Sequence, residues 1–379
     1  METTVQIDVV QGAIDQAAKY LINNIQTNGM FRYRINTNTE VKLRPKYDIL
    51  HHAGCVHALS MYHQQHPNEI THVAIKRVSR YLCKEAIRPI PGERNILAVW
   101  SRPDIHHTTK PLQARLESTG VGLLALLSLD AFHNGLVPLE YLRALGRFVI
   151  YMQPDTESFY SSYVPLLGGY TEQQPLYHYP SEVILGLVML YEKDLSITWI
   201  ETAYNALVYL IKHRQQLNSI QADPWLLLTM EKILSLESID QLSISKDLLI
   251  THAIQICDTM LQHQVYAPKR ALYDGGFVQD GRTSPTATWL EGLLAALTFL
   301  PTDYEITTRI RTAVNRGVKF LLRAQIRDGE FVGAVPRAVG KLRARRSHAA
   351  EFNQRATEIR IDYVQHTMSA WMQYLTVAQ

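Results

Sequence analysis

The sequence predicts an all-α protein whose helices form a closed (α/α)6 toroid of about six helical hairpins. Apolar residues recur with the helical i, i+3, i+4 spacing along almost the whole chain, and alternation typical of strands is nearly absent. The helical segments also alternate between two styles with a period of roughly 60 residues. One style is amphipathic, and the other is apolar almost all round, which is typical of an enclosed helix. Each repeat is therefore expected to be an exposed helix followed by a buried one.

The amphipathic segments are the expected outer helices. Each keeps a polar face for solvent, and several end in a glutamine that is followed by a polar turn and an aromatic residue, as in "IQTNGMF" and "AQIRDGEF". This regular ending predicts a structural role for the glutamines. The outer segments comprise residues 7–26, 69–86, 138–153, 197–215, 246–264 and 304–325.

The segments that are apolar all round are the expected inner helices. Each begins with polar and aromatic residues and then becomes almost wholly apolar, as in "YDILHHAGCVHALSMY" and "SPTATWLEGLLAALTFL". An open solenoid would need polar capping repeats at its ends. The first and last repeats are as apolar as the middle ones, so closure into one ring spanning residues 1–379 is expected. The inner segments comprise residues 47–62, 116–129, 177–192, 223–234, 284–300 and 361–375.

This pattern resembles the (α/α)6-barrel superfamily over nearly the whole chain. Its members include glucosidase-like and unsaturated glucuronyl hydrolases, N-acylglucosamine 2-epimerases, the barrel domain of glucuronyl C5-epimerases, lanthionine synthetase cyclases and terpenoid cyclases. The resemblance lies in architecture and helix style. The DxDD motif of terpenoid cyclases is absent, and so is the Cys-His dipeptide of the lanthionine cyclases, which leaves the carbohydrate-active relatives.

In such a ring the inner helices run parallel, so their N-termini meet at one mouth. Carboxylates, aromatic residues and histidines stand at these N-termini, and we interpret them as a pocket. Helix capping alone accounts for acidic residues at helix starts, so caps combined with core aromatics are the alternative interpretation. The candidates at the helix starts are Tyr47, Asp48, His51, Glu117, Tyr179, Glu182, Asp223, Trp225, Trp289, Glu291, Asp362, Tyr363 and His366.

Arginines lie within a few residues of these helix starts, where parallel helix dipoles favour anions. An anionic saccharide would suit such a mouth, because guanidinium groups grip carboxylates while aromatic faces stack on sugar rings. Structural ion pairs are the alternative for each arginine. A basic loop, residues 336–358, is expected either to close over a ligand or to stay solvated. The candidate arginines are Arg44, Arg115, Arg282, Arg337 and Arg360.

Composition excludes several classes of protein. The net charge of +3 is too small for a dedicated nucleic-acid binder. The three cysteines, widely spaced and without a CxxC pair, predict reduced thiols and no zinc site. No signal peptide or apolar membrane span is recognisable, so a cytoplasmic protein without a membrane partner is expected, although export by other signals would leave no visible trace.

Together these features predict a metal-independent and cofactor-independent enzyme, an epimerase, lyase or hydrolase, acting on an anionic and uronic saccharide. Epimerisation or elimination beside a carboxylate needs acid and base groups on opposite faces of the sugar and an arginine for the carboxylate. We predict Tyr179 with Glu182 as one acid and base pair and Tyr363 with His366 as the other. The alternative is a non-catalytic toroid that binds a peptide or protein partner, or a secreted effector or scaffold.

Overall fold

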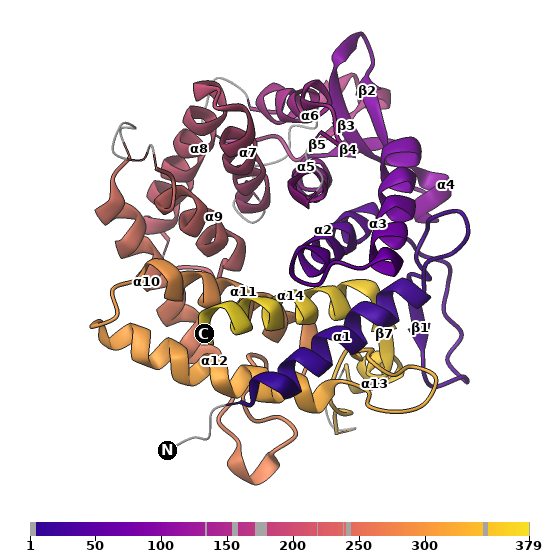
Figure 1. Cartoon of the computed structure of the whole chain (residues 1–379), viewed down its shortest axis with the longest axis vertical. Coiled ribbons are helices and arrows are strands. Elements are labelled where there is room, and N and C mark those ends of the chain that lie inside the picture. The colour runs from indigo at the N-terminus through magenta and orange to yellow at the C-terminus, as the bar shows by residue number, and fades with distance from the viewer. Residues whose placement is uncertain are drawn as a thin grey trace.

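The inner helices form a closed ring in a computed structural model of the chain (Figure 1). Each inner helix contacts the next, and the last, α14, contacts the first, α2. The inner helices are α2 (Ile49–Gln65), α5 (Leu116–Phe132), α7 (Pro180–Asp194), α9 (Pro224–Leu234), α11 (Thr283–Phe299) and α14 (Ile361–Ala378). The structure describes residues 5–132, 135–153, 158–170, 180–217, 219–237, 239, 244–343 and 348–378.

An outer helix precedes each inner helix along the chain and packs on the outside of the ring (Figure 1). Helix α12 illustrates the division: Ile310, Val314 and Leu321 face the core, while Arg311 and Arg323 are exposed. The predicted alternation of helix styles is thus confirmed. The outer helices are α1 (Ile7–Asn23), α3 (Glu69–Tyr81), α6 (Leu139–Tyr151), α8 (Ile197–Gln215), α10 (Lys246–His263) and α12 (Glu305–Ala324).

The two ends of the chain join where the ring closes. Strand β1 (Arg34–Asn36) pairs antiparallel with β7 (Glu358–Arg360), which leads directly into α14. Helix α1 also packs against α14. The predicted structural role of the outer-helix glutamines is confirmed here, because the Gln325 side chain donates to the carbonyl of Ala13 at 2.8 Å. This bond ties the end of α12 to α1.

The structure contains short β-strands, although the sequence predicted almost no strands. The expectation was wrong for "IRPIPGERNILAVWS", which forms an antiparallel hairpin turning at Gly92. The apolar part of β3 packs against α5 and α6, so its burial comes from neighbours that periodicity does not show. The sheet runs in the order β2 (Ile87–Ile90), β3 (Glu93–Ser101), β4 (Gln113–Arg115), β5 (Ser162–Val164) and β6 (Gly169–Tyr170).

The basic segment 336–358 packs partly on itself. Its short helix α13 (Ala349–Arg355) is held by Asn353, whose side chain exchanges hydrogen bonds with the backbone of Leu342 at 2.7 and 2.9 Å. Ala338, Leu342 and Phe352 belong to a small apolar cluster separate from the main core. Within the described residues, no helix is long and apolar enough to cross a membrane.

Candidate functional site

The first pair at the mouth joins two neighbouring inner helices. His366, on the second turn of α14, places Nδ1 2.9 Å from Oε2 of Glu291 on α11. Burial by itself would lower the pKa of His366, but the charge and hydrogen bond of Glu291 raise it above its usual value. Burial also raises the pKa of Glu291. The Trp225 ring, from α9, lies at 76° to the imidazole plane with ring centroids 6.5 Å apart. His366 can thus exchange a proton with a ligand that lies beside the Trp225 ring.

The second group lies where α14 begins, beside α2. Arg360 grips Asp362 through two bonds, with Nε to Oδ1 at 2.5 Å and Nη2 to Oδ2 at 2.6 Å. His51 of α2 lies 3.8 Å from the same carboxylate, and its Nδ1 lies 2.6 Å from the hydroxyl of Tyr33. Although burial raises the pKa of Asp362, His51 and Arg360 lower it to about 2. Asp362 is therefore a fixed anion at neutral pH.

The third group centres on Arg115, just before α5. Its guanidinium contacts Glu117 and lies 3.9 Å from Asp48, the residue that caps α2 through the amide of Leu50. Asp48 also acts electrostatically on His51, so this group adjoins the one around Asp362. The Arg115 side chain, which lies between these two carboxylates, is about 30% exposed and can be reached by a ligand.

The fourth group contains Glu182, in the first turn of α7. Burial, together with the charge of Asp223, raises the pKa of Glu182 to about 8, and Arg115 offsets only part of this effect. Its buried Oε2 has no hydrogen-bond partner among the described residues. Asp223 is itself fixed by Ser181 and by the buried Arg214, each at 2.6 Å. Glu182 is therefore a carboxylic acid that keeps its proton at neutral pH.

These groups form one continuous electrostatic set, which we call the mouth group. Glu182 is coupled to Arg115, Asp48 links Arg115 to His51, and His51 and His366 are both coupled to Asp362. The mouth group comprises His51, Asp48, Arg115, Glu117, Glu182, Asp223, Trp225, Glu291, Arg360, Asp362 and His366.

Several predicted residues lie outside the mouth group. Tyr47 is buried and accepts from the backbone amide of Phe31 at 3.0 Å. Trp289 packs against Phe277 and His263, on the side of α11 toward the loop before it. The exposed Arg44 contributes only its carbonyl, which accepts from Arg34 at 2.5 Å.

The remaining candidates flank the mouth group. Arg282 pairs with Asp280 at 2.8 Å, and Arg337 stacks on Phe352 with its charge 4.7 Å from the ring centroid. The hydroxyl of Tyr363 lies 3.4 Å from the buried Glu358, although its ring lies under Arg360. Tyr179 lies outside the described residues.

Sequence reasoning missed two residues that hold members of the mouth group in place. Tyr33 belongs to the loop after α1, where no periodic pattern signals its contact with His51. Arg214 lies on an outer helix, and its polar character there predicts exposure, whereas the structure buries it against Asp223. By contrast, Asp223 and Trp225 are among the residues expected from the sequence, because both stand at an inner-helix start.

Comparison with known proteins supports the architecture. The sequence matches no family model and no curated protein. Among solved structures, cellobiose 2-epimerase from Bacillus thermoamylovorans is similar with a TM-score of 0.71 at 10% identity, over 98% of each chain. An unsaturated glucuronyl hydrolase specific for heparin has a TM-score of 0.63 at 14% identity, over 98% of each chain. A possible GH105 family member from Salmonella enterica has a TM-score of 0.63 at 12% identity, over 100% of this chain and 97% of that one.

These likenesses show the fold: the chain is an (α/α)6 toroid, as its helix pattern predicted. Physically, the mouth group combines a buried acid that retains its proton, an imidazole held by a carboxylate, and two accessible guanidinium groups. Such a set can donate and accept protons on a ligand held between the inner helices.

Proposed function

We propose that this protein is a carbohydrate-active enzyme that moves protons on a sugar bound at the mouth of the toroid. The feature that carries the proposal is the buried Glu182, whose pKa burial and Asp223 raise to about 8, in the same electrostatic set as the His366–Glu291 pair. A general acid and a general base poised near neutral pH are what isomerisation, epimerisation or elimination requires. The similar structures include sugar epimerases and a glucuronyl hydrolase, which favours a saccharide as the ligand.

In the proposed reaction, His366 removes a proton from the carbon beside a carbonyl or carboxylate of the sugar. The Nε2 of His366 serves as the base, since Nδ1 is engaged by Glu291 and no described residue bonds to Nε2. Glu182 donates its proton to the oxygen on which negative charge develops. Return of a proton to the carbon gives an isomer or epimer, and loss of a neighbouring group gives elimination. No metal or cofactor takes part in these steps.

An anionic and uronic sugar is the proposed substrate class. Arg115 and Arg360 are about 30% and 17% exposed at the mouth, and each already holds a carboxylate of the protein. A substrate carboxylate would share or replace one of these partners, and bidentate binding by a guanidinium would orient it. Neutral sugars would lack this interaction, so the proposal implies tighter binding of uronides.

The test is solvent exchange on defined sugars. We would incubate the enzyme in heavy water with cellobiose, mannose and uronic disaccharides, and follow deuterium at each carbon and new products by NMR. Proton transfer predicts deuterium incorporation for a uronide, and His366→Asn should reduce it by roughly 100-fold or more. Trp289→Phe, which lies outside the mouth group, should retain activity.

Two outcomes would contradict the proposal. Cleavage of a disaccharide without deuterium incorporation would indicate hydrolysis through two carboxylates instead of proton transfer at carbon. Absence of any turnover, with no thermal stabilisation by any of the sugars, would indicate that the mouth does not act on sugars.

A further inference from the structure

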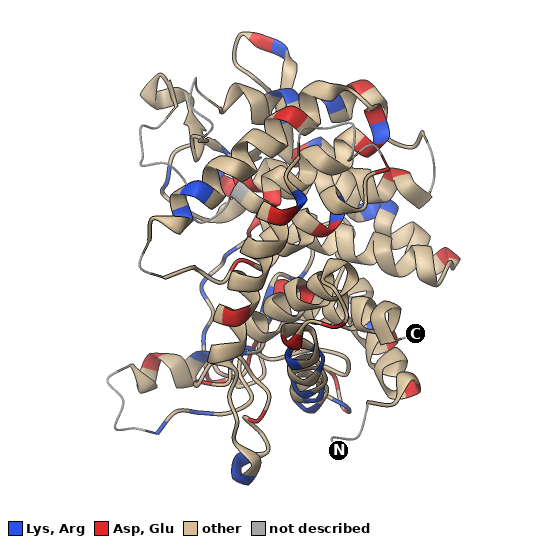
Figure 2. Cartoon of the chain, turned by 90° about the vertical axis from the view of Figure 1, so that its left-hand side faces the viewer, with Lys and Arg blue, Asp and Glu red and all other residues tan. Residues whose placement is uncertain are grey.

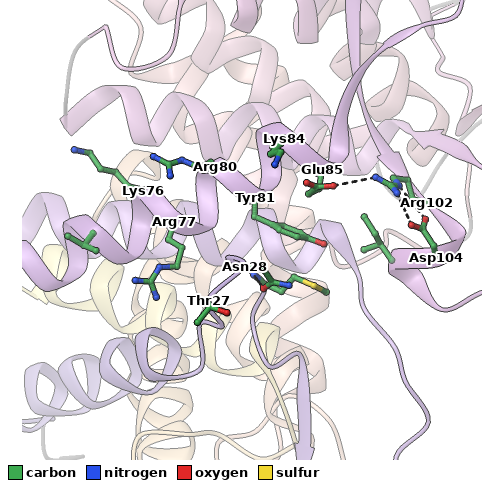
Figure 3. A pocket seen from close by; sticks show the side chains of 13 residues that line it. Thr27, Asn28, Lys76, Arg77, Arg80, Tyr81, Lys84, Glu85, Arg102 and Asp104 are labelled. Carbon is green, nitrogen blue, oxygen red and sulfur yellow. Dashed lines mark hydrogen bonds and ion pairs between the residues drawn. The ribbon is translucent and has the colours of Figure 1, made fainter.

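A second basic site lies outside the ring, between the loop after α1 and the outer helix α3 (Figure 3). It is a cavity of about 740 Å³ on the outer wall, distinct from the mouth group. In Figure 3 Lys76, Arg77 and Arg80 project from α3, Lys84 from the turn that follows it, and Arg102 lies beside Asp104. The basic residues that line the cavity are Lys76, Arg77, Arg80, Lys84 and Arg102.

Carboxylates of the described residues pair with only one of the five basic residues of this cavity. Arg102 pairs with Glu85 at 3.4 Å and with Asp104 at 2.7 Å, but no described carboxylate lies within ion-pair distance of the four basic residues of α3 and its extension. The outer helix α12 is different, because its Arg309 and Arg316 pair with acidic residues of neighbouring elements. Figure 2 likewise shows acidic and basic residues interspersed over the face that it presents.

The spacing of the cations suits a linear polyanion. Lys76 and Arg80 are four residues apart on α3, so helical rise places them about 6 Å apart along one side, and Lys84 follows in the π-helical turn Leu82–Ala86. All three are exposed. A chain with regularly repeated negative charges can contact them in sequence, and release of its counterions would favour binding at low salt.

The lining also suits sugar rings. Tyr81, Met30 and Ile105 add aromatic and apolar surface between the charges, and the carboxylates of Glu85 and Asp104 can accept hydrogen bonds from hydroxyl groups. The sugar–phosphate backbone of DNA has no free hydroxyl group along the strand to donate to these carboxylates. The combination of repeated cations with acceptors at one end therefore favours an acidic oligosaccharide.

Strands β3 and β4 and the short helix α4 (Pro103–His106) link the cavity to the mouth group. Arg102, which lines the cavity, follows Ser101 of β3, and Ser101 pairs with Gln113 of β4, the strand that carries Arg115. Asp104 lines the cavity, and His106, two residues later, is within electrostatic reach of Asp104, Asp48 and Arg115. One ligand of several sugar units could therefore cross α4 and extend from the mouth to α3.

We propose that this cavity is an exosite for an acidic oligosaccharide, whose reacting unit occupies the mouth while its following units lie along α3. The inference rests on the proposed function for the identity of the reacting unit. It adds that the substrate is a chain of several uronic units, with affinity that increases with chain length.

The experiment measures binding directly, with size-defined oligogalacturonides of two and ten units. One variant combines Lys76→Gln, Arg80→Gln and Lys84→Gln. A matched control removes three exposed positive charges from other outer helices, with Lys19→Gln, Lys212→Gln and Arg311→Gln. Both variants lose three positive charges from the wild-type net charge of +3 and keep good helix formers. Circular dichroism verifies that each variant is folded.

We expect the wild type and the control to bind the ten-unit chain more tightly than the two-unit chain. The α3 variant should bind the ten-unit chain roughly 10- to 100-fold more weakly at low salt, and bind the two-unit chain unchanged. A plot of log affinity against log salt concentration should also have a shallower slope for the α3 variant. The slope should differ from that of the wild type by roughly two to three, because three cations are missing.

Three results would overturn the exosite. They are equal affinity of the α3 variant and the wild type for the ten-unit chain, an equal loss in the control, and equally tight binding of a single-stranded oligonucleotide of the same charge. None of these results affects the proton-exchange assay on disaccharides. Conversely, a failure of that assay with chain-length-dependent binding intact would refute the proposed chemistry and leave the exosite as a binding site.

Discussion

Replacing Glu182 with glutamine should make the protein more stable while removing its activity. With a pKa of about 8 in the folded protein, Glu182 holds its proton at pH 7, whereas in the unfolded chain it ionises near 4.5. The folded state thus binds more protons than the unfolded state between these pH values, so stability falls as pH rises through this window. Below about pH 4.5 both states are protonated and the penalty vanishes.

The size of the effect follows from the pH difference. About 2.5 pH units separate pH 7 from 4.5, the pKa of an ordinary glutamate. At roughly 1.36 kcal/mol per unit, keeping Glu182 protonated in the fold lowers the free energy of unfolding by about 3 kcal/mol. Glutamine mimics the neutral acid and carries no such penalty. Its amide would still lack a partner at the position of the buried Oε2, which costs about 1–3 kcal/mol. The net gain at pH 7 is therefore about 0–2 kcal/mol, and it should grow toward pH 8.

Urea unfolding, followed by circular dichroism at pH 4.5, 6, 7 and 8, measures the free energy of unfolding of Glu182→Gln and of the wild type. The matched control is Glu117→Gln at the start of α5, where the carboxylate pairs with Arg115. That change should lower stability by up to about 1 kcal/mol at pH 7, because an ion pair is lost. If Glu182→Gln instead destabilises the protein at pH 7 and 8 with the pH dependence of the wild type, Glu182 is ionised in the fold and our reasoning is wrong.

Three further predictions concern pH, backbone and thiols. Turnover should fall as pH rises past about 8, because Glu182 loses the proton that it donates, and a pH–rate profile still rising at pH 9 would contradict this. Gly333→Ala should cost about 3 kcal/mol or more in thermal unfolding, since φ is 88° and a Cβ would lie 2.0 Å from the Gln16 carbonyl; Gly92→Ala, with φ of 87° and open space, should cost only about 1 kcal/mol. Burial raises the pKa of all three thiols, so slow reaction with a thiol reagent is expected in the folded protein, and rapid reaction or stoichiometric zinc by elemental analysis would contradict it for Cys55, Cys83 and Cys257.

The sequence by itself determined the ring, because the physical cause of the pattern is local. A helix that is apolar all round, such as residues 116–129, can only be enclosed, and an amphipathic one such as α12 can only lie outside it. Alternation of the two styles along the whole chain then leaves little choice of architecture. Strand β3 escaped prediction because its burial depends on α5 and α6, which both come later in the sequence and meet it only in the folded protein.

The tertiary structure alone decided which residues at the starts of the inner helices face one another. Position at a helix start is common to Trp289, Glu291 and Tyr47, yet only Glu291 meets His366. Rotation about each helix axis sets these directions, and small differences in where a helix begins change them by about 100° per residue. The proton on Glu182 is likewise a product of packing, because desolvation and the charge of Asp223 act only after distant segments have come together.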